Sequence, residues 1–117
     1  MNIWKSEEPK YLPPKQAVAV VKAVVCEHFD ITPKDLVGEE RTEHLSRIRT
    51  MAMVLAHETS GLTLSEVGKH FARKHSTVMK ALKRHQDTME VDRHYRGQVV
   101  TVKAKLLRKI VEMNQGL

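Results

Sequence analysis

The sequence has little of several residue types, and each scarcity narrows the range of functions. Cys26 is the only cysteine among 117 residues, so an internal disulfide is impossible and a reducing cytoplasm is the expected compartment. Aromatic residues make up only 4% of the chain, which argues against stacking of single-stranded bases on exposed rings. A secretory signal and an apolar run of about 18 residues are both missing, so we expect no membrane-spanning segment.

The sequence also lacks the common motifs of catalysis. Its five glycines lie far apart, and the phosphate-binding pattern G-x-x-x-x-G-K followed by Ser or Thr does not occur. His70, His75 and His85 lie close in sequence, but no H-E-x-x-H occurs and Cys26 has no partner cysteine for a zinc site. No nucleophile elbow or pair of catalytic carboxylates stands out. We therefore expect no enzymatic activity, no bound nucleotide, no metal and no other cofactor.

Positive charge is concentrated in one part of the sequence. The formal net charge is +6 and the isoelectric point is about 9.6. No acidic residue occurs between Val67 and Gln86, whereas this segment holds six basic residues: Lys69, Arg73, Lys74, Lys80, Lys83 and Arg84. Solvated helix faces usually mix charges of both signs. The segment therefore indicates an anionic partner, and the low aromatic content favours a nucleic-acid duplex over a single strand.

The chain is short enough for one domain. Residues 1–14 contain three prolines and show no periodicity, so we interpret them as an N-terminal tail or arm. Its Trp4 and Tyr11 are expected to pack back on the domain that follows, over residues 15–117.

Apolar residues recur at helical intervals along that domain, which predicts an all-α bundle of about five to six helices. A first helix covers the segment KQAVAVVKAVVCEHF, with Pro14 at its first position. Thr32 and Pro33 begin a one-turn helix that Gly38 ends. After the polar loop GEERTEH, a second apolar stripe belongs to a helix that stops at Gly61; its residues are Leu45, Ile48, Ala52, Leu55 and Ala56.

The next two helices form a recognisable pattern. The segment TLSE at 63–66 is a capping box, and it begins a short helix that runs to about Phe71. A tight connection leads to a second, basic helix, which holds Val78, Met79 and Leu82. Two short helices joined in this way are typical of a helix-turn-helix, whose second helix enters the major groove of DNA. A final helix is expected from Asp92 to near Gly116, with inward residues Val99, Val102, Leu106 and Ile110.

Several longer segments extend this pattern. KDLV, RTMAMVLA, TLSEVGKHFARKHSTV and MKALKR follow one another along the chain. From about Gln16 to Leu107 the sequence resembles the C-terminal DNA-binding domain of the bacterial replication initiator DnaA. That family carries DLL, a basic loop, RQMAMYLA and SLPEIG-x-x-FGGRDHTTV at nearly the same intervals. The resemblance implies a Trp-repressor-like helix-turn-helix that binds double-stranded DNA, with a role in replication initiation, in its regulation, or in transcription.

The resemblance also implies which residues read bases. In the family, a histidine and two small hydroxyl residues that open the recognition helix reach base edges in the major groove, and they match His75, Ser76 and Thr77 here. A Thr methyl can pack on a thymine methyl, and hydroxyl or imidazole groups can bond base edges. Lys74 replaces the family's aspartate, so it can donate to guanine or to a phosphate. The alternatives are helix capping by the two hydroxyls and a buried or solvated histidine.

Contacts to the DNA backbone are expected as well. The amides of Leu64 and Ser65 begin the first helix of the motif and can donate to a phosphate. The candidates for neutralising phosphates are Arg41, Arg47, Arg49, Lys69, Arg73, Lys80 and Lys83. The family's basic loop reads GEERTEHLSRIR here, and the arginine that enters the minor groove aligns with Glu43. A carboxylate is repelled by that negative groove, so we expect this one contact to be absent.

One alternative function stays open from the sequence. Because no nucleotide-binding motif is found, the chain is expected to act as the DNA-reading domain alone, in a bacterium or a phage. The alternative is a protein-interaction module on the same fold, which binds an acidic protein surface or modulates a replication initiator. The acidic loop from Glu39 to Glu43 favours that alternative. The salt dependence of DNA binding separates the two, because phosphate contacts make affinity fall steeply with salt.

Overall fold

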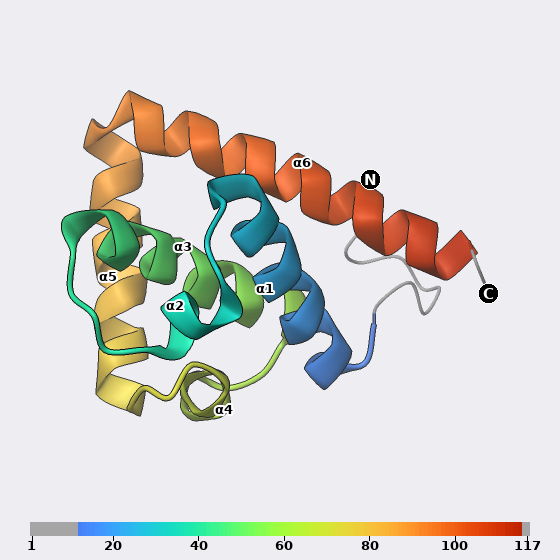
Figure 1. Cartoon of the computed structure of the whole chain (residues 1–117), viewed down its shortest axis with the longest axis horizontal. Helices are drawn as coiled ribbons and strands as arrows, with labels where there is room; N and C mark the ends of the chain where they lie inside the picture. The colour runs from blue at the N-terminus through green and yellow to red at the C-terminus, as the bar shows by residue number, and fades with distance from the viewer. Residues whose placement is uncertain (1–11, 116–117) are drawn as a thin grey trace.

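Residues 12–115, which are the part of the chain that this computed structural model describes, fold into six α-helices and no strand (Figure 1). The helices are α1 (Pro14–Phe29), α2 (Pro33–Val37), α3 (Glu43–Ser60), α4 (Leu64–His70), α5 (His75–Val91) and α6 (Arg93–Gln115). The prediction of an all-α bundle is confirmed. Trp4, Tyr11 and Gly116 lie outside the described residues, so what was expected of them stays a prediction.

Local capping chemistry sets most helix ends where the sequence places them. Pro14 opens α1, and Gly61, with a left-handed φ of 74°, ends α3. The Thr63 hydroxyl accepts from the Glu66 amide at 3.1 Å, which confirms the capping box of α4. One boundary differs from the prediction. The Thr42 hydroxyl accepts from the Leu45 amide, so α3 begins at Glu43 and takes two residues from the predicted loop.

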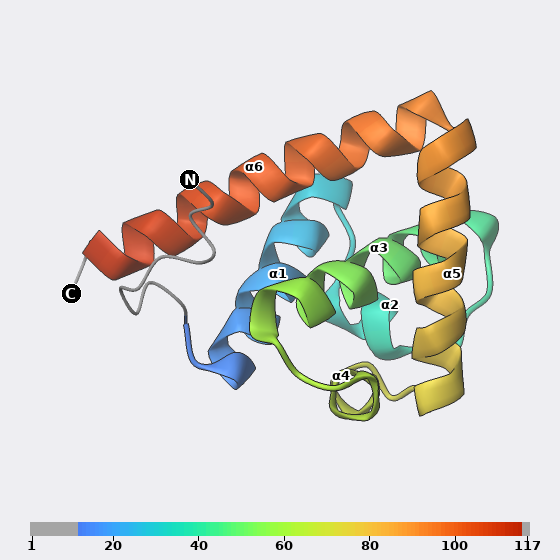
Figure 2. The same ribbon diagram turned by 180° about the vertical axis from the view of Figure 1, so that it is seen from behind.

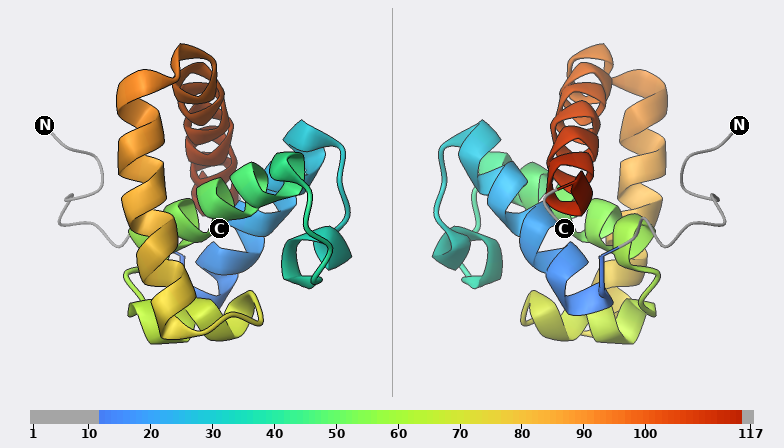
Figure 3. Two further views of the ribbon diagram at one scale, coloured as in Figure 1. Left: turned by 90° about the vertical axis from the view of Figure 1, so that its left-hand side faces the viewer. Right: turned by 90° about the vertical axis from the view of Figure 1, so that its right-hand side faces the viewer.

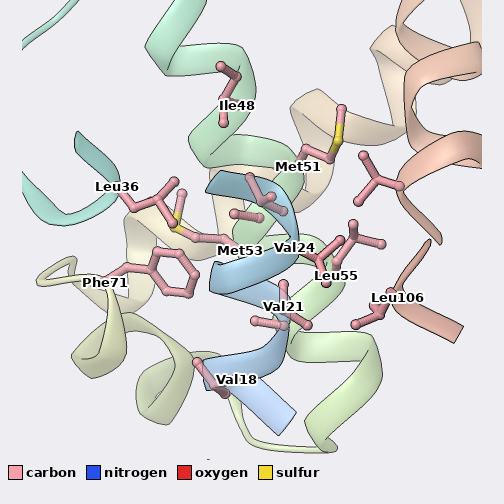
Figure 4. Packing of buried hydrophobic residues seen from close by; sticks show 14 of the residues in the cluster. Val18, Val21, Val24, Leu36, Ile48, Met51, Met53, Leu55, Phe71 and Leu106 are labelled. Atoms are coloured by element: carbon pink, nitrogen blue, oxygen red, sulfur yellow. The ribbon is translucent and has the colours of Figure 1, made fainter. Parts of the chain in front are cut away.

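Helix α1 supplies the centre of the hydrophobic core. Its Val18, Val21 and Val25 are buried, and Figure 4 shows α1 valines surrounded by side chains from α2, α3, the end of α4 and α6. Burying one such side chain contributes about 1.5–3 kcal/mol, so these valines fix how the outer helices pack. All four inward residues expected of the last helix are buried as well: Val99, Val102, Leu106 and Ile110. On α5 the core face consists of Val78, Ala81 and His85, whereas Met79 is 49% exposed.

The two ends of α5 lie in different parts of the molecule. Its N-terminus lies beside α4, and its C-terminus meets α6 on the opposite side (Figures 1 and 2). Asp92 fixes the α5–α6 corner, because one carboxylate oxygen accepts from the Tyr95 amide at 3.0 Å and the other pairs with Arg47. The buried Tyr95 hydroxyl lies 2.7 Å from His85 Nδ1, which ties α6 to α5. Burial raises the pKa of Tyr95 to about 12 and lowers that of His85.

A glycine allows α4 and α5 to approach closely. Gly68 is buried, and its carbonyl oxygen accepts from the Phe71 amide at 3.0 Å and from the Arg73 amide at 2.8 Å. A Cβ at residue 68 would lie 2.4 Å from the Arg73 carbonyl oxygen and 3.4 Å from a methyl group of Val78. The first of these distances is a severe overlap with the main chain. Only glycine therefore lets the turn fold back against α4.

The Gly68→Ala variant is expected to lower the free energy of unfolding by about 1–3 kcal/mol, because the added methyl group overpacks the turn. Gly97→Ala is the matched control, since a Cβ at residue 97 in α6 meets nothing within 4 Å. That control should be as stable as the wild type or more stable by up to about 1 kcal/mol, because alanine favours a helix interior. Urea denaturation measures both. Equal stability of the two variants would show that the turn has room to relax.

Candidate nucleic-acid interface

The turn between α4 and α5 is fixed by its own backbone conformation, by a contact from α1 and by one buried side chain. Ala72 adopts a left-handed φ of 55°, which reverses the chain after Phe71. From α1, the Lys22 ammonium donates to the His70 carbonyl and lies 4.8 Å from the centroid of the Phe71 ring. Phe71 itself is completely buried. The recognition helix α5 therefore leaves the turn in a direction that the core determines.

The first turn of α5 is exposed and has no internal anion. Lys74, His75, Ser76 and Thr77 are all exposed, so the structure brings the four predicted base-reading residues together at one end of one helix. Lys74 occupies the N-cap position, no side chain caps the helix, and the first turn contains no acidic residue. A helix N-terminus carries partial positive charge and unsatisfied amides. The end of α5 is therefore an open site for an external anion.

For these residues the structure excludes helix capping by the two hydroxyls and a buried histidine, and it contains a solvated histidine. Ser76 and Thr77 do not cap α5, because Lys74 is the N-cap residue and makes no side-chain cap bond. His75 is exposed, so it is a solvated histidine and not a buried one. All three side chains are exposed and therefore accessible to a partner.

A cleft lies beside this helix end. It has a volume of about 700 Å³ and separates α5 from the α2–α3 loop and the first half of α3. Five of its lining residues are basic and one is acidic: Arg41, Arg49, Arg73, Lys80, Arg84 and Glu39. Thr77 also lines the cleft, so the exposed first turn of α5 and the positive surface are continuous. Figure 3 shows the loop and α5 facing each other across α3.

Two of these arginines hold main-chain carbonyl groups. Arg73 donates to the carbonyls of Val37 at 3.1 Å and Gly38 at 2.6 Å, and so connects the turn to the end of α2. Arg49 is only 6% exposed and donates to the carbonyls of Asp35 at 2.9 Å and Glu40 at 2.5 Å. Burial lowers the pKa of Arg73, with Arg49 nearby contributing in the same direction. Both side chains were expected at the DNA backbone, and the structure uses them to hold the α2–α3 loop.

Two further arginines are paired within the protein. Arg47 forms an ion pair with Asp92 and lies 5.6 Å from the centroid of the Tyr95 ring, so it belongs to the α5–α6 corner. Arg84 pairs with Glu43 at 2.9 Å and donates to the Ser46 hydroxyl at 2.7 Å. The Glu43 carboxylate, for which the sequence predicts the loss of a minor-groove contact, therefore neutralises a cation of α5. Sequence spacing could not reveal that pair, because its partners are far apart along the chain.

The remaining predicted backbone contacts are available to a partner. Four exposed cations make no ion pair within residues 12–115: Arg41, Lys69, Lys74 and Lys80. Lys83 is exposed but lies 3.3 Å from Asp87. The amides of Leu64 and Ser65 begin α4, where main-chain donors lack partners within the helix.

Sequence reasoning missed a second basic surface. Helix α6 carries six basic residues and one acidic residue, Glu112. The basic residues are Arg93, Arg96, Lys103, Lys105, Arg108 and Lys109. The net charge of the chain outside residues 67–86 is zero, because acidic residues elsewhere offset the positive charge of α6. The total charge therefore did not reveal this cluster. Counting charge by predicted helix would have found it.

Neither a membrane span nor a metal site is found among residues 12–115. No helix there is long and apolar enough to cross a membrane. No group of three or more His, Cys, Asp or Glu side chains in that range is arranged to hold a metal ion.

A helical bundle of this kind, with a short helix, a glycine-dependent turn and a second helix that opens with exposed polar residues, defines a helix-turn-helix domain. The family model described as the bacterial DnaA protein helix-turn-helix matches residues 18–84. The chain belongs to this DnaA helix-turn-helix family.

Two full-length relatives agree with this assignment. The chromosomal replication initiator protein DnaA of Mycobacteroides abscessus is 33% identical over 93 residues, which are 80% of this chain and 19% of the relative. The protein of the same name from Thermomicrobium roseum is 33% identical over 88 residues, which are 74% of this chain and 19% of the relative. The chain therefore spans about a fifth of the length of these relatives.

The role of Arg73 can be measured as stability. Arg73→Ala is expected to cost about 1–3 kcal/mol of unfolding free energy, because it removes a charged donor shared by main-chain carbonyls. Lys80→Ala should change stability by less than about 0.5 kcal/mol, since Lys80 is exposed and unpaired. Chemical denaturation of both variants tests the difference. An Arg73→Ala protein as stable as Lys80→Ala would mean that Arg73 is free to contact a ligand.

Proposed function

We propose that this protein binds double-stranded DNA sequence-specifically through its helix-turn-helix, with α5 as the recognition helix. The observation that carries the proposal is the first turn of α5, which is exposed, lacks any acidic residue and has no side-chain cap. A DNA duplex supplies an anion for the uncapped helix end and a groove that accommodates its exposed side chains. Its phosphates are anions, and its major groove admits a helix end.

We assign base reading to the four residues at this helix end. Ser76 and Thr77 present hydroxyl groups, and the Thr77 methyl can pack on a thymine methyl. His75 can donate to or accept from a base edge. Lys74 is the N-cap residue and can reach guanine or a phosphate. The exposure of the four side chains and the match to the family support these roles.

We assign backbone neutralisation to four cations. Arg41, Lys69, Lys74 and Lys80 are exposed and unpaired among the described residues, and Arg41 and Lys80 line the cleft. The positive lining of the cleft suits a phosphate strand between the loop and α5. The amides of Leu64 and Ser65 can donate to a second strand position. Arg49 and Arg73 support this surface from behind by holding the loop.

The cellular role follows the relatives only as a proposal. We propose action in replication initiation, in its regulation or in transcription control, in the cytoplasm where the chromosome lies. A purely protein-binding role based on the acidic loop has weaker support. Glu43 belongs to α3 and pairs with Arg84, so the loop presents less free negative charge than its sequence suggests.

The salt dependence of DNA binding tests the four cations together. About four phosphate contacts should give a slope of log K against log salt near −3.6, because each contact contributes about −0.9. Lys80→Ala should reduce the steepness by about 0.9. Lys109→Ala, a matched change on α6, should leave the slope unaltered. A flat response of the wild type would favour the protein-binding role, and a shallower slope for Lys109→Ala would place DNA on α6.

Base reading is tested by comparing two duplexes. A preferred site is first selected from a random duplex library, and affinity is then measured on that site and on unrelated DNA. Thr77→Ala should lose about 1–3 kcal/mol on the preferred site and little on unrelated DNA, because base contacts specify the sequence. Lys80→Ala should weaken both complexes alike. Thr101→Ala, the same change on the exposed surface of α6, serves as the control and should weaken neither. Equal losses on both duplexes for Thr77→Ala would rule out base reading by this residue.

A further inference from the structure

Helix α6 carries a second apolar face that the core does not use. Its inward residues are buried against α1 and α5. A different row consists of Val100, Ala104, Leu107 and Val111, which we name the α6 stripe. Val100 is 61% exposed and Val111 is 41% exposed, Ala104 is exposed and Leu107 is half-buried. Large apolar side chains in a contiguous exposed row commonly mark an interaction surface.

The spacing of the stripe is that of a helix–helix seam. Its members are separated by four, three and four residues, which is the alternation of apolar positions in a heptad repeat. Gly97 continues the row toward the N-terminus, where a Cβ would meet nothing within 4 Å. The four residues from Val100 to Val111 extend about 16 Å along the helix axis. A partner helix could therefore lie along α6 for about three turns.

Charge at the edges of the stripe indicates which partner fits. In a heptad seam the flanking positions set partner choice. Here one edge carries Arg96 and Lys103, and the other carries Thr101 and Arg108. No acidic residue occupies either edge. Lys103 lies 3.6 Å from Glu58, but Arg108 has no partner within the described part of the chain.

These observations distinguish among possible occupants. A second copy of this chain would bring the same basic edges, and like charges across a seam are repulsive. A DNA duplex would meet the cations but would leave the apolar row without a counterpart. A helix with an apolar face and acidic edges can pack against the apolar row and can also pair with the basic residues beside it. The stripe also lies away from the recognition end of α5, because α6 and α4 are on opposite sides of the molecule (Figures 1 and 3).

We propose that the α6 stripe binds an amphipathic helix of a partner protein whose apolar face is flanked by acidic residues. This surface is separate from the proposed DNA interface, so one molecule can hold DNA at α5 and the partner at α6. The proposal goes beyond DNA binding and does not depend on it. Its failure would leave the salt and base-reading experiments unaffected.

The test uses two synthetic peptides of about three heptads with the same Leu and Ile seam. One carries Glu at its flanking positions and the other carries Lys. Fluorescence anisotropy with the full 117-residue chain measures both affinities. The acidic peptide should bind about tenfold more tightly than the basic one. Each exposed ion pair contributes little by itself, but several pairs together reach this difference. Equal affinities, or no binding at about 100 μM, would overturn the proposal.

Variants of α6 locate the binding. Val100→Asp should abolish binding of the acidic peptide, and it should fold because residue 100 is largely exposed. Arg108→Glu should weaken the acidic peptide about three- to tenfold. Lys109→Glu makes the same charge change one residue away and about 100° around the helix, so it should change affinity less than about twofold. If Arg108→Glu and Lys109→Glu weakened the acidic peptide equally, the peptide would be attracted by the overall charge of α6. That result would overturn the proposed helix–helix contact.

Two further measurements address other occupants. Sedimentation of the wild type should show a monomer, and a dimer that Val100→Asp dissociates would mean that a second copy covers the stripe. Trp4→Ala should leave peptide affinity unchanged, and a marked gain would mean that the chain's own N-terminal segment competes for it. Either contrary result would overturn a partner helix as the occupant. DNA affinity of Val100→Asp should equal that of the wild type, which separates this surface from α5.

Discussion

The geometry of the helix-turn-helix depends on the close approach of α4 to the following turn at Gly68. The Gly68 carbonyl accepts from the amides of Phe71 and Arg73, and no side chain can occupy the space between residue 68 and the turn. This contact sets where α5 starts and in which direction it leaves. With the turn closed, Phe71 is completely buried and Lys22 reaches across it to the end of α4. The exposed first turn of α5 is thus presented by a rigid support.

The positive charge of this end serves two purposes. Arg49 and Arg73 satisfy carbonyl groups of α2 and the following loop, and they hold that loop against the turn. Arg41, Lys69, Lys74 and Lys80 stay exposed and unpaired among residues 12–115. The Arg49 and Arg73 guanidinium groups line the cleft and form no ion pair within residues 12–115, so they still add positive potential there. The structure therefore separates cations that hold main-chain carbonyls from cations that stay exposed.

Glu43 neutralises part of the positive charge of α5. It belongs to the first turn of α3, where a carboxylate favours the helix N-terminus, and it pairs with Arg84 on α5. Arg84 lines the cleft, so the pair reduces the positive charge there. Helix α6, in contrast, carries an excess of positive charge, and its basic residues flank an exposed apolar row. The two faces of the protein therefore suit different partners.

The sequence by itself determined the helices, their order and the helix-turn-helix, because capping boxes, glycine stops and apolar periodicity act over a few residues. It also placed the base-reading candidates on one turn of one helix, since they are consecutive. Only the tertiary structure decided which arginines are free, because the carbonyls that hold Arg73 are about 35 residues away in sequence. The same holds for α6. Periodicity reveals two apolar rows on that helix, but only packing against α1 and α5 decides which row is buried and which is left for a partner.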